Sequence, residues 1–430
     1  MTEADTCRRF ITPALVKAGW SSDTQIREQF AFTDGRISPQ GRTGKRQAGK
    51  RADYLLDYQP GVPLAVVEAK ANDIPATDGL QQAIDYAVIL GIPFAFAANG
   101  REIIWRNRLT GEESRPAEFP SPGQLWNLFR KETDLGDRPA EVLLTPAYDD
   151  PSRRPRYYQV LAANRAIERL AGGEERVLLT LATGTGKSVI AFQICWRLWR
   201  ANWNRRGISR RRPRILYLAD RGVLVDQPML QHFAPFGDAM IKVSPKTTLG
   251  REMYFATYQQ LAEDERRPGL YREYPQDFFD LVLVDECHRG SARDESTWRE
   301  ILDWFTGAAK LGMTATPFRE ETRNTYEYFG DPVIEYSLAH RRRLPRPLPR
   351  PARGHRRRRR WLAARTRPAR PLRRGDPGRR LRHHRLRARP LADRSDGSDG
   401  DMANRLLAVH QPARQDHRLL RRPGARPADA

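Results

Sequence analysis

The sequence predicts an α/β protein with two α/β domains and a C-terminal tail that does not form a core. Three observations support this. In residues 1–150, short apolar runs bounded by Pro and Gly surround one run with helical spacing. In residues 151–340, strands and helices alternate regularly, which is typical of a parallel sheet covered by helices on both faces. Residues 341–430 are so rich in Arg and Pro that they bury too little apolar surface to offset chain entropy.

The first region reads as a small α/β domain with buried strands. Its expected elements are strands at Tyr54–Leu56, Leu64–Val67 and Phe94–Ala98, a helix at Leu80–Leu90, and loops at Pro116–Gly123 and Gly136–Pro139.

The second region contains five apolar runs of strand length with helical segments between them. The expected strands are Val177–Leu181, Ile215–Ala219, Met253–Ala256, Leu281–Asp285 and Leu311–Met313. The run at 281–284 is apolar without alternation, as expected for a strand that is buried on both faces.

Nearly all of the net charge lies in the tail. Residues 341–430 hold 29 Arg, 7 Asp and no Lys or Glu, a net of +22 out of +23, so residues 1–340 carry only +1. DNA binding by the first 340 residues must therefore depend on specific sites. The tail is either a basic nucleic-acid-binding arm or the product of a shifted reading frame in a GC-rich gene. The second interpretation is favoured because basic arms usually contain Lys and Ser as well.

The remaining composition indicates a cytoplasmic protein. Cys7, Cys195 and Cys287 have no metal-ligand spacing and form no disulfide framework, which fits a reducing compartment. The N-terminus has no apolar core typical of a signal peptide. The apolar stretch at 87–98 is too short to cross a bilayer.

A phosphate-binding loop follows the strand at 177–181. The loop and the start of its helix are Thr183, Gly184, Thr185, Gly186, Lys187 and Ser188. The glycines let backbone N–H groups face phosphate oxygens. Lys187 is expected to reach the β- and γ-phosphates, and the Ser188 hydroxyl to bind Mg²⁺. The strict pattern has Gly where this chain has Leu181.

Two later motifs complete a predicted ATP site. Asp285 and Glu286 end an apolar strand, where an α/β sheet binds ligands. Asp285 is expected to hold Mg²⁺ through water, and Glu286 to orient the attacking water. Thr314 and Thr316 are expected to sense the nucleotide and couple it to DNA, together with His288; Cys287 is expected to be a buried thiol.

These three motifs resemble those of superfamily 2 helicases and translocases. Gln159 lies where that superfamily often has a glutamine that reads adenine. The stretches 285–291 and 311–317 look like the motor (R) subunit of type I restriction enzymes.

A second constellation lies in the first region. Asp53 precedes a strand that contains Glu68 and Lys70, which point to one face because side chains alternate along a strand. Asp53 and Glu68 are expected to bind Mg²⁺, and Lys70 to stabilise charge on the scissile phosphate. Gln82 and Tyr86 resemble the glutamine–tyrosine motif of this family's nucleases; a helix packed on the sheet explains Tyr86 equally well.

The resemblance covers about residues 10–338 and implies three regions. These are a restriction-endonuclease-like nuclease domain at 1–150, a RecA-like N-terminal helicase lobe at 151–340, and a disordered or frameshifted tail at 341–430. The N-terminal segment around 24–28 also resembles the family, so Glu28 is a candidate addition to the metal site. The implied cofactors are ATP and Mg²⁺. The implied partners are double-stranded DNA and the methyltransferase (M) and specificity (S) subunits.

In the family, a second motor lobe supplies an arginine to the ATP site, and this sequence stops matching near Leu338. We therefore expect this polypeptide to bind ATP without translocating DNA. Two alternatives stay open: a superfamily 2 helicase of repair or plasmid function, and a non-catalytic DNA- or nucleotide-binding remnant.

Overall fold

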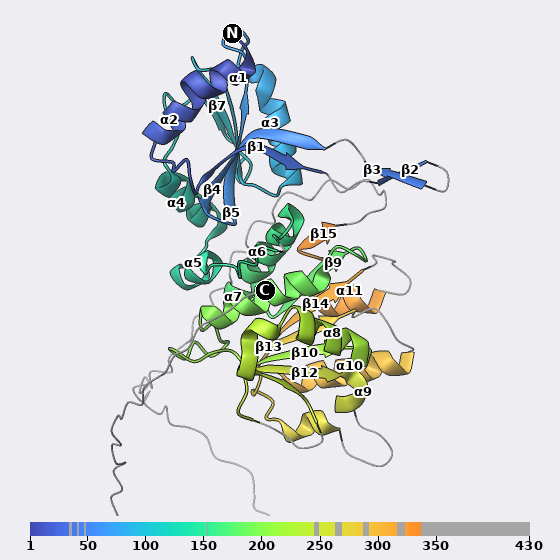
Figure 1. The fold of residues 1–430 in the computed structure, drawn as a ribbon. Coiled ribbons are helices and arrows are strands. Elements are labelled where there is room, and N and C mark those ends of the chain that lie inside the picture. Colours follow the sequence, from blue (N-terminus) through green and yellow to red (C-terminus); the bar gives the residue numbers. More distant parts are fainter. Residues whose placement is uncertain are drawn as a thin grey trace, which may run out of the picture. The chain divides into compact units, whose positions relative to one another are not determined.

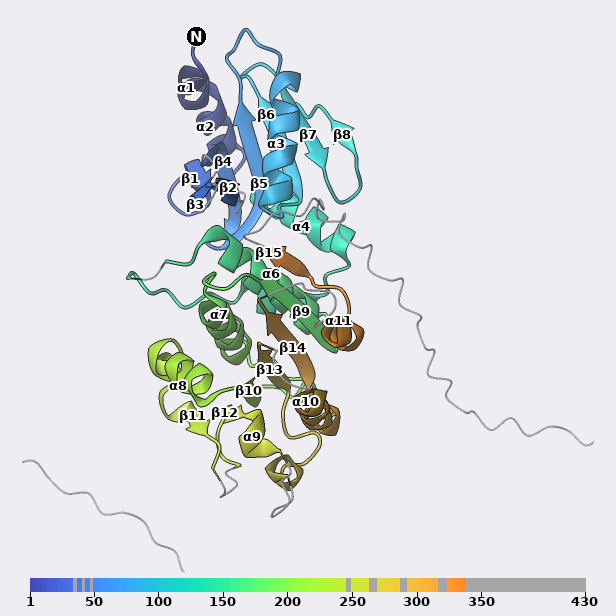
Figure 2. The same cartoon turned by 90° about the vertical axis from the view of Figure 1, so that its right-hand side faces the viewer.

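The structure is a computed structural model of the chain (Figures 1 and 2). It describes residues 1–33, 49–152, 154–244, 249–262, 269–286, 292–315 and 323–336, with backbone only at 292–297 and 323–324 and for the strands at 37–40 and 43–46. The predicted tail at 341–430 lies outside these residues.

Residues 26–114 contain a mixed sheet whose strands run in the order β1-β4-β5-β6-β7-β8. The strands are β1 (Ile26–Phe32), β4 (Lys50–Gln59), β5 (Val62–Ala69), β6 (Phe94–Ala98), β7 (Ile103–Asn107) and β8 (Glu113–Ser114). β5 and β6 are parallel and the other neighbours are antiparallel. The strands β2 (Ile37–Gln40) and β3 (Thr43–Arg46) form a separate hairpin.

Helices cover both faces of this sheet. They are α1 (Glu3–Thr6), a π-helical turn at Cys7–Ile11, α2 (Thr12–Lys17), α3 (Thr77–Ile89) and α4 (Pro122–Thr133), whereas α5 (Asp137–Leu144) packs on α6 (Tyr157–Ala171) and α7 (Lys187–Arg200). On one face, α3 packs Ala83 and Ala87 against Val66. On the other, α4 packs on β4 and β5, where Trp126 stacks on Tyr58 with ring centroids 4.7 Å apart.

The predicted loops at Pro116–Gly123 and Gly136–Pro139 extend too far, because each one ends inside a helix. α4 begins at Pro122, after the cap residue Ser121, and α5 begins at Asp137, after Gly136. Pro is tolerated in the first turn of a helix, where its missing N–H has no intrahelical partner. Pro122 and Gly136 therefore mark the starts of helices, whereas the sequence pattern predicts loops at both positions.

Residues 176–336 form a second sheet in which every pair of neighbouring strands is parallel, in the order β11-β12-β10-β13-β14-β9-β15. The strands are β9 (Arg176–Leu181), β10 (Ile215–Ala219), β11 (Met240–Lys242), β12 (Met253–Thr257), β13 (Leu281–Asp285), β14 (Ala309–Thr314) and β15 (Ile334–Tyr336). The parallel sheet and its five predicted strands are confirmed. The two edge strands, β11 and β15, were not predicted.

The helices of this region precede β9 or lie between the strands. They are α6 (Tyr157–Ala171), α7 (Lys187–Arg200), α8 (Gly222–Gln231), α9 (Tyr258–Leu261), α10 (Ala292–Trp304), α11 (Arg323–Phe329) and short 3₁₀ turns at Ala234–Ala239 and Leu270–Glu273. The order β13-β14-β9 brings the carboxyl ends of three strands together, with Asp285 opposite Met313 and Thr314 opposite Thr180.

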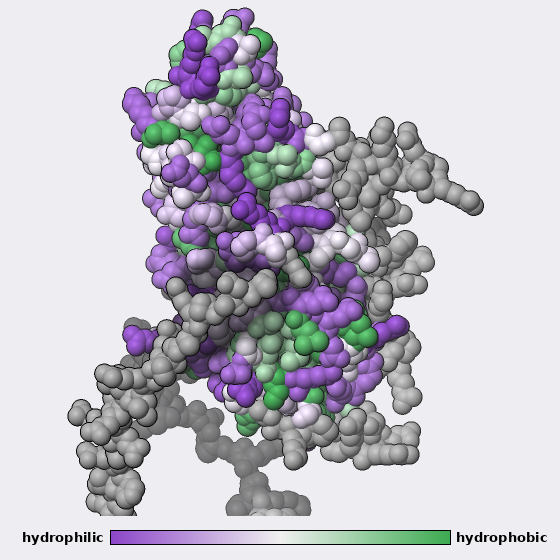
Figure 3. Space-filling view, viewed as in Figure 1, coloured by the Kyte–Doolittle hydropathy of each residue, from purple (hydrophilic) through white to green (hydrophobic). Residues whose placement is uncertain are grey.

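The surface is largely polar, with scattered apolar residues. Figure 3 shows hydrophobic atoms over the part of the second sheet where α8 lies. Val223 and Leu230 on this helix are 61% and 75% exposed. Among the described residues, no helix combines the length and the apolar character needed to cross a membrane.

Candidate functional site

The predicted nuclease residues lie on the α3 side of the first sheet. Asp53 is on β4, Glu68 is near the end of β5, and Lys70 follows β5 directly. The backbone N–H of Ala69 donates to Asp53 Oδ2 at 2.8 Å, which holds this carboxylate beside the end of β5. The alternation expected from the sequence is present, because Val67 and Ala69 belong to the core on the opposite face.

Gln82 on α3 connects the other members of the cluster. Its Nε2 donates to Glu68 Oε2 at 3.0 Å and lies 3.1 Å from the Tyr86 hydroxyl. Its Oε1 accepts from Lys70 Nζ at 3.4 Å. The five predicted residues Asp53, Glu68, Lys70, Gln82 and Tyr86 are therefore brought together.

Glu68 is an unusual carboxyl group because it is only 2% exposed. Burial, and then the nearby charge of Asp53, raise the pKa of Glu68 to about 8. Without a cation, the two carboxylates cannot both be charged at low cost. A divalent cation between them would remove that cost.

The donor set fits magnesium. Glu68 Oε1 is buried and has no hydrogen-bond partner among the described residues. No group of three His, Cys, Asp or Glu side chains suited to a metal occurs in this described part of the chain. Mg²⁺ is commonly held by one or two carboxylates plus phosphate oxygens and water, so Asp53 and Glu68 suffice when substrate supplies the rest.

Glu28 lies on β1, the strand next to β4, opposite Tyr54 in the register. Its carboxylate accepts from Thr12 Oγ1 at 3.1 Å, and among the described residues it makes no hydrogen bond to Asp53 or Glu68. Its place in the metal site stays a prediction.

Two neighbours of the cluster were missed from the sequence. Gln29 Nε2 donates to Asp53 Oδ1 at 3.1 Å from a left-handed backbone with φ of 50°. Glu3 pairs with Lys70 at 3.3 Å. The run Gln25 to Gln29 offers no sequence signal for the first contact, because it depends on the twist of β1 against β4.

The predicted phosphate-binding loop connects β9 to α7. Gly184 and Gly186 have φ of 81° and 82°, a left-handed conformation that favours glycine. A Cβ at residue 186 would lie 2.4 Å from Gln159 Nε2, the end of a flexible side chain, so a side chain here would displace Gln159 from the loop. Gln159 Nε2 donates to the Thr185 carbonyl at 2.8 Å, which ties the start of α6 to the loop.

Lys187 and Glu286 form a largely buried ion pair at 2.9 Å. They come from α7 and from the end of β13, so strand order alone brings them together. Glu286 has a left-handed backbone with φ of 56°, which costs free energy for a non-glycine residue. Of the remaining loop residues, Thr183 is exposed, Thr185 is buried and Ser188 lies at the start of α7.

Asp285 is buried, and one of its oxygens is bound by a residue that the sequence did not indicate. The Tyr217 hydroxyl on β10 donates to Asp285 Oδ2 at 2.8 Å. Asp285 Oδ1 has no hydrogen-bond partner within the described ranges. Burial raises the pKa of Asp285, and the unpartnered oxygen suits a hydrated cation. The donor set fits Mg²⁺ bound with nucleotide.

Thr314 is fully buried at the end of β14, beside Thr180. The predicted coupling residues His288 and Thr316, and Cys287, lie outside the described residues. Cys7 and Cys195 are free thiols.

Comparisons with known proteins show that the chain resembles restriction-enzyme subunits. A family profile described as "Type III restriction enzyme, res subunit" matches residues 152–319. The endonuclease subunit of the type I restriction enzyme EcoAI from Escherichia coli is 44% identical over 346 residues, or 79% of this chain. This chain is a homologue of type I restriction-enzyme endonuclease subunits.

Two further relatives extend the comparison. The EcoKI endonuclease subunit of Escherichia coli strain K12 is 26% identical over 76% of this chain. A solved fragment assigned to the HsdR subunit of a Vibrio vulnificus YJ016 type I enzyme is 47% identical and has a TM-score of 0.68. It covers 79% of this chain and 60% of its own. These matches confirm the family resemblance and the fold class. The chain spans 42% of the EcoAI subunit and 34% of the EcoKI subunit.

Proposed function

We propose that this chain carries the Mg²⁺-dependent nuclease domain, residues 1–150, and the ATP-binding motor lobe, residues 151–340, of a type I restriction enzyme's R subunit. One observation carries the proposal. The polar cluster that Gln82 organises around Glu68 and Lys70 occurs in the same chain as a phosphate-binding loop whose lysine meets an acidic strand end.

In the nuclease domain, Asp53 and Glu68 would hold the metal ion, which supplies an activated water and neutralises phosphate charge. Lys70 would donate to a phosphate oxygen and so stabilise charge that develops there. Gln82 positions both Glu68 and Lys70, so it acts through them. Tyr86 and Glu28 would support the site.

In the motor lobe, backbone N–H groups of Gly184 to Lys187 would bind the phosphates of ATP. Ser188 and Asp285 would hold Mg²⁺, directly and through water. Lys187 would leave Glu286 for the phosphates, and Glu286 would then be free to orient a water. Gln159 would contact the adenine, and Thr314, Thr316 and His288 would couple nucleotide state to DNA.

In the assembled enzyme, ATP hydrolysis would drive DNA translocation and the nuclease would cut both strands. The R subunit would work with M and S subunits on double-stranded DNA in the cytoplasm. Target recognition would belong to the S subunit.

The test is a crossed pair of variants. Asp53→Asn should abolish Mg²⁺-dependent cleavage of plasmid DNA and leave binding of a fluorescent ATP analogue unchanged. Lys187→Ala should weaken analogue binding by at least about 100-fold and leave the metal site of the nuclease domain intact, as measured by Mn²⁺ titration.

Each failure has its own meaning. Nucleotide binding without any Mn²⁺ binding at Asp53 and Glu68 in the wild-type chain would favour a helicase of another function. Loss of both activities in both variants would show that the sites are not separate.

A further inference from the structure

The connection between α7 and β10 carries a concentrated positive charge. Residues 200–214, hereafter the arginine loop, contain no Asp or Glu and seven Arg: Arg200, Arg205, Arg206, Arg210, Arg211, Arg212 and Arg214. Residues 1–340 as a whole have a net charge of only +1. In a parallel sheet, the chain segment that enters β10 lies at the edge opposite the carboxyl ends that hold the nucleotide. The nucleotide site therefore does not account for this charge.

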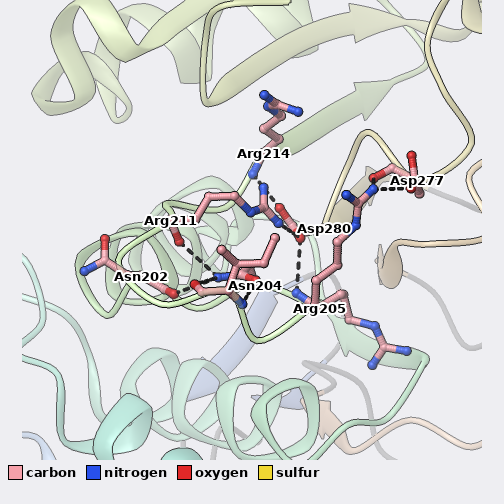
Figure 4. A network of polar contacts seen from close by, with 9 residues as sticks. Asn202, Asn204, Arg205, Arg211, Arg214, Asp277 and Asp280 are labelled. Atoms are coloured by element: carbon pink, nitrogen blue, oxygen red, sulfur yellow. Dashed lines mark hydrogen bonds and ion pairs between the residues drawn. The ribbon is translucent and has the colours of Figure 1, made fainter.

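One buried amide organises the loop. Asn204 Nδ2 donates to three carbonyl oxygens of the loop, those of Asn202, Ile208 and Arg211, at 2.8 to 3.2 Å. Its Oδ1 accepts from the Ile208 N–H at 2.8 Å. These four hydrogen bonds close the loop around one side chain (Figure 4).

One buried carboxylate attaches the loop to the sheet. Asp280, which precedes β13 and is 2% exposed, accepts from the N–H groups of Arg205 and Arg214 at 3.1 and 2.9 Å. It also accepts from Arg211 Nη2 at 2.5 Å. Figure 4 shows the Arg211 guanidinium beside Asp280 and the Arg214 side chain pointing away from it. Asp280 thus neutralises one arginine and fixes the backbone that presents the others.

Several of the other arginines are held in place without a charged partner. The Arg212 guanidinium lies 3.8 Å above the Trp199 ring centroid, and Arg214 lies 4.4 Å above Phe278. A guanidinium stacked on a ring keeps its N–H edges available for hydrogen bonds.

Arg210 stands at the exposed tip. Its backbone is left-handed, with φ of 59°, which costs free energy for a non-glycine residue. Its side chain makes no ion pair or hydrogen bond with any residue in the described part of the chain. Ser209 and Arg212 beside it are also exposed.

We propose that the arginine loop binds the phosphate backbone of double-stranded DNA, outside the nuclease and nucleotide sites. Arg205, Arg206 and Arg211 pair with Glu175, Asp277 and Asp280. Arg210, Arg212 and Arg214 have no such acidic partner among the described residues, and guanidinium groups of this kind bind phosphates through paired N–H groups. A protein interface needs an apolar centre, and the only large apolar residue exposed in the loop is Ile208, at 44%. The inference rests on the proposed function in that DNA is taken as the macromolecular substrate.

Overall affinity does not isolate this surface, since residues 341–430 hold 29 further Arg. The test is therefore local. The full chain is modified with an arginine-specific glyoxal, with and without a 40-base-pair duplex of unrelated sequence, and each arginine is followed by mass spectrometry. DNA should slow modification of Arg210 and Arg212 several-fold. Arg115, which is paired with Glu102 in the first domain, should react at the same rate.

Variants give a second readout. Arg210→Glu/Arg212→Glu should lower the slope of log K against log salt by about 2, because each phosphate contact contributes about 0.9. Arg210→Lys/Arg212→Lys should keep most of the slope, which separates charge from misfolding. Lys17→Glu/Lys131→Glu makes the same charge change on exposed positions of α2 and α4 and should leave the protection of Arg210 and Arg212 unchanged.

Three outcomes would overturn the proposal. DNA could leave Arg210 and Arg212 fully reactive, or protect Arg115 equally. Alternatively, a polyglutamate peptide could protect the loop when DNA does not, which would assign it to an acidic protein. Protection of the loop in a chain that never cleaves DNA with Mg²⁺ would instead count against the proposed nuclease and leave this assignment standing.

Discussion

The two candidate sites both set a lysine beside buried carboxylates, but the chain builds them differently. Around the nuclease cluster, Asp53, Glu68 and Lys70 come from one antiparallel strand pair, and a helix glutamine completes the network. At the nucleotide site, Lys187 and Glu286 lie about a hundred residues apart and meet only through the order of parallel strands. The first site depends on side-chain contacts, whereas the second depends on backbone shape.

This difference predicts which changes do the most damage at each site. Backbone changes should dominate at the nucleotide site, and side-chain changes at the nuclease site. Four experiments test this difference between the two sites.

The largest effect is expected for Gly186→Ala. The new Cβ would lie 2.4 Å from Gln159 Nε2 in a backbone with φ of 82°. Affinity for a fluorescent ATP analogue should fall by about 100-fold, because the backbone strain adds to the loss of the Gln159–Thr185 hydrogen bond that the new Cβ would displace. Gly184→Ala is the matched control. Its φ is 81° but its Cβ meets open space, so the loss should be about tenfold. Equal losses would contradict the role of the Gln159 contact.

Gln82→Ala should slow Mg²⁺-dependent DNA cleavage by about 10- to 100-fold, since residues that orient metal ligands have effects of this size. Nucleotide affinity should not change. The control is Gln81→Ala on the same helix, which removes only an exposed hydrogen bond to Asp85. If both variants cut DNA at the wild-type rate, Gln82 does not position Glu68 and Lys70.

Tyr217→Phe should weaken Mg²⁺-nucleotide binding by about tenfold, because Asp285 loses the hydrogen bond that orients it. Tyr254→Phe on the adjacent strand β12 removes a hydroxyl that accepts from the Arg251 N–H, outside the site. It should leave nucleotide binding unchanged. A larger loss in Tyr254→Phe would remove the special role given to Tyr217.

The smallest effect concerns stability and pH. Because the pKa of Glu68 is raised to about 8 from its ordinary 4.5, the folded, metal-free chain holds a proton that the unfolded chain releases. Its contribution to stability is complete below about pH 4.5 and is lost as pH rises through 8.

Glu68→Gln should therefore stabilise the metal-free chain by about 1–2 kcal/mol at pH 8 and hardly at all at pH 5, as measured by thermal unfolding. Added Mg²⁺ should stabilise the wild-type chain at pH 8 and not the variant. A variant that is less stable than the wild type at pH 8 would show that Glu68 is ionised there.

Much of the fold was predictable because strands buried on both faces leave an unmistakable apolar run, as at Leu281–Val284. The short edge strands were not. β8 has two residues and β15 has three, so neither carries a periodic pattern. The helix starts at Pro122 and Asp137 were assigned to loops because a first-turn proline resembles a loop proline in sequence. The functional roles of the site residues, the domain limits at 150 and 340, and the nature of the tail stay predictions.

By itself, the sequence determined the features that depend on short stretches of chain. These are the left-handed glycines of the phosphate loop, the shared face of Glu68 and Lys70, and the alternation that builds a parallel sheet. Tertiary structure alone decided which distant groups meet: Tyr217 with Asp285, Gln29 with Asp53, and the arginine loop with Asp280. The physical reason is that the spacing of residues along a strand or helix determines on which face each side chain lies. Which partner it finds depends on strand order, register and twist, and those are set by the packing of the whole domain.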